Sequence, residues 1–158
     1  MSDAPADPAD PAAIVRRVEA SFAKQAIMGT IGAELLHVEP GLVEIALAVT
    51  PAVFQQHGFV HAGAVATIAD SAAGYAALTR MPEGRGVLTA EFKINLLAPA
   101  AGARLVAIGT VVKAGRLLSV AEARVFAERI AGDDGTRKLC AQLTATLVAV
   151  ENRQGVVD

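Results

Sequence analysis

Hydrophobic and polar positions along the chain separate two helical stretches from six stretches that alternate with the period of a strand. Near the N-terminus, Ile14, Val18 and Phe22 recur every four residues, which predicts one face of a helix. Asp10-Pro11 is typical of an N-cap followed by the first residue of such a helix. Gly29 lies where we expect this helix to end.

From Ile31 the period changes to two, which is typical of strands. Residues 31–38 and 42–49 flank Glu39-Pro40-Gly41 and predict a strand, a tight turn and a second strand. Four further strands are predicted, at residues 86–97, 104–113, 117–130 and 137–150. Ala114-Gly115 and Asp133-Asp134-Gly135 are the turn signals between the last three.

The longest apolar stretch lies between the second and third strands, where residues 62–78 predict a helix of small and apolar side chains. Asp70 lies near its middle. A carboxylate buried without partners costs several kcal/mol, so Asp70 either faces solvent or is held in a cleft for a chemical reason. The stretch is slightly short for a membrane span and carries this aspartate, so we predict no transmembrane helix.

The order of elements predicts an α+β fold: a helix, two strands, the long apolar helix and four strands. Consecutive hairpin strands give an antiparallel sheet. A helix nearly free of polar residues must be covered on most sides, and the simplest cover is a strongly curved sheet wrapped around it. With no internal repeat or linker, residues 11–151 are expected to form one domain after a disordered tail at residues 1–10.

Composition narrows the classes of function. Of the 158 residues, 53% are hydrophobic and only 4% aromatic, which indicates an aliphatic interior and apolar surface hidden between subunits. The net charge of −2 does not indicate the basic surface that a nucleic-acid-binding protein needs. One cysteine, Cys140, excludes an intramolecular disulfide and favours a reducing compartment. Because the acidic N-terminus is unlike a signal peptide, we expect a cytoplasmic protein that binds no membrane. In the alternation of its strand, Cys140 falls on the face of Gln142 and Thr144, where we expect it to be inert.

The loop before the apolar helix resembles that of hotdog-fold acyl-CoA thioesterases, in particular their phenylacetate-pathway (PaaI)-like branch. The segment that carries the resemblance is Gln55-x-x-Gly58-x-x-His61-Ala62-Gly63, followed by Asp70, Thr89 and residues 92–99. The pattern of that family is Asn-x-x-Gly-x-x-His-Gly-Gly, with an acid eight residues after the first glycine of the pair. Two residues depart from it, since Ala62 replaces a glycine and Gln55 an asparagine.

The resemblance implies hydrolysis of an acyl-CoA thioester in a hotdog fold. It assigns Asp70 as general base or nucleophile and the backbone N–H of Ala62 as the donor to the oxyanion, at a helix N-terminus whose N–H groups are unpaired. Gln55 would orient the carbonyl or water, and Thr89 would bond the water or Asp70. The complete set of implied catalytic residues is Asp70, Ala62, Gln55, Thr89, His61 and Gly63. Three residues near the hairpin turn are implied to meet the CoA phosphates, as basic residues around this turn do in the family: Lys113, Gly115 and Arg116.

Helix geometry adds an inference that does not need the family. Ala62 and Asp70 are eight residues apart, which is about 12 Å along a helix. An aspartate side chain cannot span that distance to one carbonyl carbon, so two groups acting on one thioester must come from different chains. The resemblance agrees, because it implies a homodimer as the smallest active unit and pairs of dimers as a homotetramer. It implies no metal or redox cofactor.

Two alternatives stay open at this point. His57 or His61 together with Asp70 could support hydration or dehydration of an acyl thioester on the same fold. The departures at Ala62 and Gln55 also permit a non-catalytic acyl-CoA-binding module. A zinc site at His57 and His61 lacks a third ligand nearby in the sequence, and Ser71 lies in no G-x-S-x-G elbow. The sequence does not identify the acyl group.

Overall fold

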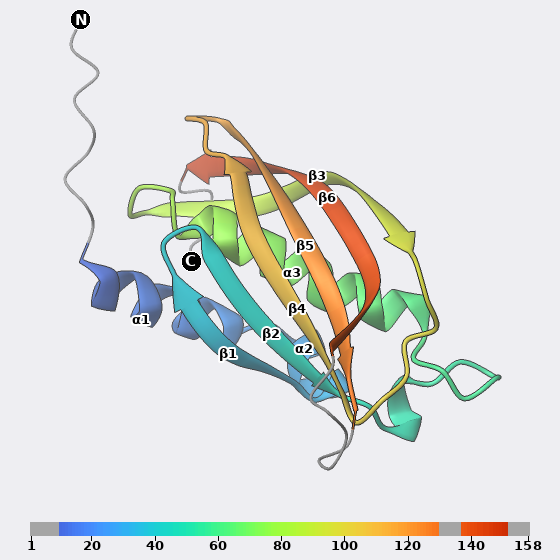
Figure 1. Ribbon diagram of the computed structural model, residues 1–158. Coiled ribbons are helices and arrows are strands. Elements are labelled where there is room, and N and C mark those ends of the chain that lie inside the picture. Colours follow the sequence, from blue (N-terminus) through green and yellow to red (C-terminus); the bar gives the residue numbers. More distant parts are fainter. Residues whose placement is uncertain (1–9, 130–136, 152–158) are drawn as a thin grey trace, which may run out of the picture.

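The computed structural model describes residues 10–129 and 137–151 (Figure 1). Its helices are α1 (Pro11–Phe22), α2 (Ala26–Ile31) and α3 (Ala62–Leu78), with a short 3₁₀ helix, η1 (Pro51–Val53). Its strands are β1 (Ala33–Glu39), β2 (Leu42–Ala48), β3 (Arg85–Leu96), β4 (Arg104–Lys113), β5 (Leu118–Glu128) and β6 (Arg137–Glu151). In the part of the chain that the structure describes, no helix has the length and apolar character needed to cross a membrane.

One antiparallel sheet curves around α3, as Figure 1 shows. The strand order is β1-β2-β4-β5-β6-β3, so β1 and β3 form the two edges. Most of α3 from Val65 onward is buried against the concave face, and Gly109 of β4 lies directly against the backbone of Ala72. The predicted α+β fold with a sheet wrapped around the apolar helix is confirmed.

The N-terminal helix differs from its prediction. Asp10 caps α1, since its Oδ1 accepts a hydrogen bond from the Ala12 N–H at 3.0 Å, as expected. However, α1 ends at Phe22, and a separate helix, α2, continues to Ile31. Gly29 lies inside α2, and the residue that ends it is Gly32, in the left-handed conformation at φ 72°. Only a glycine adopts that conformation without strain, so the stop falls three residues later than predicted.

The long helix and the strands follow the sequence pattern closely. The bounds of α3 and β4 are those predicted, and the remaining strands differ at their ends. The prediction failed at Cys140, where the register between β5 and β6 shifts. This irregularity turns Cys140 inward beside Ala141, so the thiol is buried and does not share a face with Gln142. The predicted turn at residues 133–135 and the predicted tail, apart from Asp10, lie outside the described residues.

Candidate active site

The loop before α3 is held by backbone hydrogen bonds that set the start of the helix. The Gln55 N–H donates to the Phe59 carbonyl at 2.8 Å, and the His61 N–H donates to the Val53 carbonyl at 2.8 Å. Gly58 takes a positive φ of 81°, which closes the loop. The Gln55 side chain contributes as well, because its Oε1 accepts from the His57 N–H at 2.5 Å. Its Nε2 has no acceptor in the described part of the chain.

His61 is the N-cap of α3. Its Nδ1 accepts a hydrogen bond from the Gly63 N–H at 2.9 Å, and its carbonyl accepts from Ala64 and Val65. Within residues 10–129 and 137–151, the N–H of Ala62 has no hydrogen-bond acceptor, and Ala62 is exposed. An unpaired N–H in the first turn of a long helix, at the positive end of its dipole, is suited to stabilising a developing negative charge.

A groove of about 450 Å³ opens beside this helix terminus. It is lined mainly by apolar side chains of the loop, the helix and the segment after β3. The lining residues are Gln55, Phe59, Val60, Ala62, Val65, Leu96, Leu97, Ala98, Pro99, Ala100 and Cys140. Sequence reasoning missed the place of Cys140 here, because the shift in strand register that turns it inward has no marker in the sequence.

Asp70 is part of a second cluster, two turns further along α3. Its Oδ1 accepts a hydrogen bond from Oγ1 of Thr89 on β3 at 2.8 Å. Burial raises the pKa of the Asp70 carboxyl above its usual value, and the Thr89 bond partly offsets this rise because it stabilises the charged form. An irregularity in the pairing of β3 with β6 between Thr89 and Glu91 leaves Ala90 as an extra residue. Thr89 pairs with the buried Leu147 and therefore faces the helix.

The structure thus forms two half-sites in one chain. Gln55, His61, Ala62 and Gly63 lie together at the start of α3, whereas Asp70 lies with Thr89 and does not line the groove. Both halves belong to one continuous helix. At about 1.5 Å per residue their separation along the axis is about 12 Å, as the sequence predicted.

The hairpin after β4 lies near the opposite end of α3 and carries Lys113, Gly115 and Arg116. The α3 C-terminus is marked by Thr79, whose Oγ1 accepts from the Gly41 N–H at 2.7 Å, and Gly41 in turn bonds Val111 near this hairpin. The α3 N-terminus lies instead beside Ala100, which bonds Val60. A helix of 17 residues separates the two ends by about 25 Å (Figure 1). Within one chain, these residues do not meet Ala62.

The remaining polar candidates lie apart from both clusters. No group of three or more His, Cys, Asp or Glu side chains suited to a metal ion occurs within the residues that the structure describes. His57 is exposed on the loop, 3.4 Å from the Gln56 amide. Ser71 donates to Oε1 of Gln25 at 3.3 Å, a contact that ties α3 to the segment between α1 and α2.

Comparison with known proteins identifies the family. Residues 57–131 match the model of the thioesterase superfamily. A thioesterase family protein from Silicibacter pomeroyi has 46% sequence identity and a TM-score of 0.83, over 88% of this chain and 99% of that one. This chain belongs to the thioesterase superfamily. No match was found among curated proteins.

Two further solved structures share the fold of the present chain. The E. coli PaaI protein from the phenylacetic acid degradation operon has a TM-score of 0.78 at 17% identity, over 94% of this chain and 99% of that one. The BH2602 protein from Bacillus halodurans, solved with CoA, has a TM-score of 0.70 at 26% identity, over 90% of this chain and 91% of that one. The hotdog fold and the resemblance read from the loop are therefore confirmed, and the thioesterase family indicates a hydrolase.

Proposed function

We propose that this thioesterase hydrolyses acyl-CoA thioesters at sites shared between the two subunits of a homodimer. The observation that carries the proposal is that α3 holds an unpaired Ala62 N–H and the Thr89-bonded Asp70 carboxylate about 12 Å apart. Each half has one part of the chemistry, an oxyanion donor or an acid. In the proposed dimer, the donor of one subunit and the acid of its partner act on the same thioester.

The proposed reaction uses Asp70 as a general base. The carboxylate takes a proton from water, the resulting hydroxide attacks the thioester carbonyl carbon, and the negative charge that develops on the carbonyl oxygen is bonded by the Ala62 N–H. Collapse of this intermediate breaks the C–S bond, and CoA leaves as the thiolate, which takes the proton from Asp70. Direct attack by the carboxylate needs the same ionised group, so both routes depend on Asp70. In this proposal Gln55, which lines the groove, supplies its Nε2 as a second donor, and the reaction uses no metal or redox cofactor.

The exposed edge of the sheet supports dimerisation. β3 is a twelve-residue edge strand, and no strand of the described residues pairs with its outer side. Phe92 and Leu96 pair with the buried residues Ala145 and Ala141, so they face the concave side, yet they are 45% and 55% exposed. An apolar edge of this length is a typical surface for pairing with a second copy. We propose that two copies meet along β3 and the N-terminal half of α3, and that dimers pair into a tetramer.

Two substitutions test the chemistry. Asp70→Asn removes the base, and Ala62→Pro removes the donor with little effect on the helix, because proline is favoured at the first helical position and His61 already has the extended conformation required before it. Each variant is expected to lose roughly 100-fold or more in kcat. Hydrolysis by Asp70→Asn at close to the wild-type rate would reject the proposal.

Mixing the two inactive variants tests the shared site. After subunit exchange, mixed dimers contain one intact site and one doubly defective site, so activity is expected to return to about a quarter of wild type. A site within one chain predicts no recovery.

A panel of acyl-CoAs with thiol detection identifies the acyl group, and an enoyl-CoA hydration assay separates this proposal from a hydratase. Tight binding without turnover would indicate a binding module.

A further inference from the structure

A second hollow adjoins the groove at the α3 N-terminus. This hollow has a volume of about 790 Å³ and shares Phe59 and Pro99 with the groove. A ligand with its reacting carbonyl at Ala62 would have to pass these two side chains to reach the second hollow.

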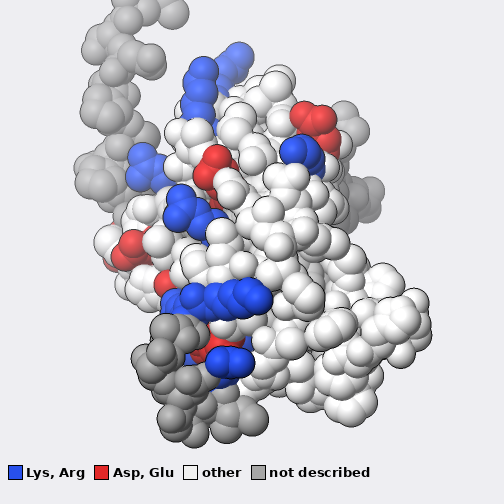
Figure 2. Space-filling view, turned by 45° about the vertical axis from the view of Figure 1, so that its right-hand side comes forward, with Lys and Arg blue, Asp and Glu red and all other residues white. Residues whose placement is uncertain are grey.

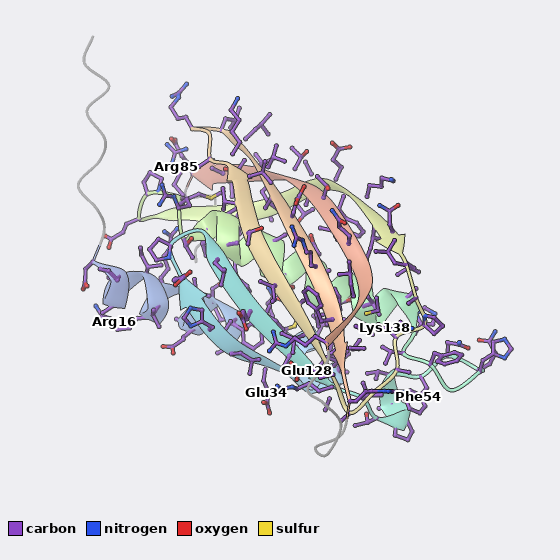
Figure 3. The ribbon with its side chains drawn as sticks, viewed as in Figure 1. Arg16, Glu34, Phe54, Arg85, Glu128 and Lys138 are labelled. Atoms are coloured by element: carbon purple, nitrogen blue, oxygen red, sulfur yellow. The ribbon has the colours of Figure 1, made fainter. Side chains whose placement is uncertain are left out.

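The second hollow is basic, whereas the groove is apolar. Arg129, Arg137 and Lys138 line it. Figure 2 shows the Lys and Arg side chains gathered around acidic atoms on the lower part of this face, beside a broad uncharged surface. In Figure 3, Glu128 and Lys138 lie at the same end of the molecule as Phe54, which begins the loop beside the groove.

Glu128, which precedes Arg129 in the chain, is paired with two arginines. Oε1 of Glu128 accepts from Nε of Arg137 at 2.7 Å, and Oε2 accepts from Nε of Arg104 at 2.7 Å. Glu128 thus holds the guanidinium groups of Arg137 and Arg104, while Arg137 and Lys138 bring positive charge to the hollow. Guanidinium and ammonium groups in such an arrangement recognise phosphate through charge-assisted hydrogen bonds.

We infer that the hollow lined by Arg129, Arg137 and Lys138 binds the phosphate groups of the CoA thioester, with the pantetheine arm in the apolar groove. This inference rests on the proposed function and adds the direction in which the substrate lies. It assigns the phosphates to the subunit that supplies Ala62, and leaves the acyl group toward Asp70 and Thr89 of the partner.

The inference differs from the assignment of Lys113, Gly115 and Arg116 that the family resemblance implies. Those residues lie near the far end of α3, a helix whose 17 residues span about 25 Å. They could reach the phosphates only from another subunit. The two assignments therefore predict different sensitive residues.

The test compares two thioesters of the acyl group that the panel shows to be hydrolysed fastest. One is the CoA thioester, and the other is the N-acetylcysteamine thioester, which has no phosphate. Lys138→Glu is expected to raise KM for the CoA thioester about tenfold, as expected for one lost charge-assisted contact. Its kcat and its kinetics on the N-acetylcysteamine thioester are expected to stay within about twofold of wild type. Lys24→Glu, an equal charge reversal on the exposed turn after α1, is the matched control and should change neither substrate.

Calorimetry with free CoA and with dephospho-CoA gives a second readout that needs no turnover. Lys138→Glu and Arg137→Gln are both expected to weaken CoA binding, and a smaller effect on dephospho-CoA would assign the contact to the 3′-phosphate rather than the diphosphate. An unchanged CoA affinity in both variants, or a loss caused by Arg116→Glu alone, overturns the inference while the proposed hydrolysis stands. If wild type hydrolyses neither thioester, the proposed function fails, and calorimetry still decides whether the hollow binds CoA.

Discussion

At the scale of single residues, the contact between Thr89 and Asp70 matters most, because it connects an edge strand to the central helix. The Thr89 hydroxyl donates to the carboxylate at 2.8 Å and lowers a pKa that burial has raised. The hydroxyl therefore favours the charged form that the proposed chemistry requires. The extra residue at Ala90 is part of this arrangement, since Thr89 faces the helix while Glu91 pairs with Thr146.

We predict that Thr89→Val moves the acid limb of the kcat/KM profile to higher pH, because the bond that lowers the pKa of Asp70 is lost. The value of kcat should fall about tenfold at pH 7. Thr89→Ser keeps the hydroxyl, so its acid limb and its kcat at pH 7 are both expected to match those of wild type. A purely structural role would lower the melting temperature of the valine variant and leave the acid limb where it was.

Asp70 also lowers stability at neutral pH. Its folded-state pKa is raised by burial, so the contribution of Asp70 to stability is fully present below the usual pKa of aspartate and is lost as pH rises through the raised pKa. The Asp70→Asn variant has no charge at this position, and its Tm at pH 7 is expected to exceed that of wild type. The difference should shrink as pH falls toward the usual pKa of aspartate. Calorimetric melting at several pH values checks this, and equal Tm values at pH 7 would contradict it.

At the scale of elements, the contact between α3 and β4 depends on the absence of a side chain. A Cβ added at Gly109 would overlap the carbonyl of Ala72, whereas one added at Gly74 of α3 would have no atom within 4 Å. We predict that Gly109→Ala lowers the free energy of unfolding by roughly 1–3 kcal/mol, because the sheet must move away from the helix. Gly74→Ala, the matched control, should raise it by roughly 0.5–1 kcal/mol through helix propensity. Urea unfolding of both variants measures the contrast.

Sequence patterns correctly predicted the helix and the strand whose apolar residues must be buried in the core. The apolar stretch of α3 and the alternation of β4 gave correct bounds, since each has one continuous face to bury. The break between α1 and α2 was missed, because the apolar spacing of Ile14, Val18 and Phe22 continues without a marker into the next turn. The inward turn of Cys140 was missed for a different reason, since it depends on how β6 pairs with β5. Pairing partners are set by the whole sheet, which a local pattern does not contain.

At the scale of the whole molecule, the proposed dimer depends on the edge strand β3. Phe92→Glu adds a charge to an exposed apolar position on the concave side. In a two-fold dimer along this edge the substitution occurs twice, so it is expected to yield monomers with roughly 100-fold lower activity. Ile27→Glu, at an equally exposed position on α2 near the opposite edge strand β1, is the control and should stay dimeric. Sedimentation velocity measures the mass, and an active monomer would exclude the shared site.

Because both half-sites lie on α3, the length of this helix between them fixes the distance between two reaction centres. Inserting one residue between Ala62 and Asp70 would lengthen the spacing by about 1.5 Å and turn the carboxylate by about 100° around the axis, away from Thr89. A loop can absorb an insertion locally, but a buried helix transmits it along its whole length. In a symmetric pair, one such change would misalign both centres at once, so the number of residues in this segment is as strictly constrained as their chemical identity.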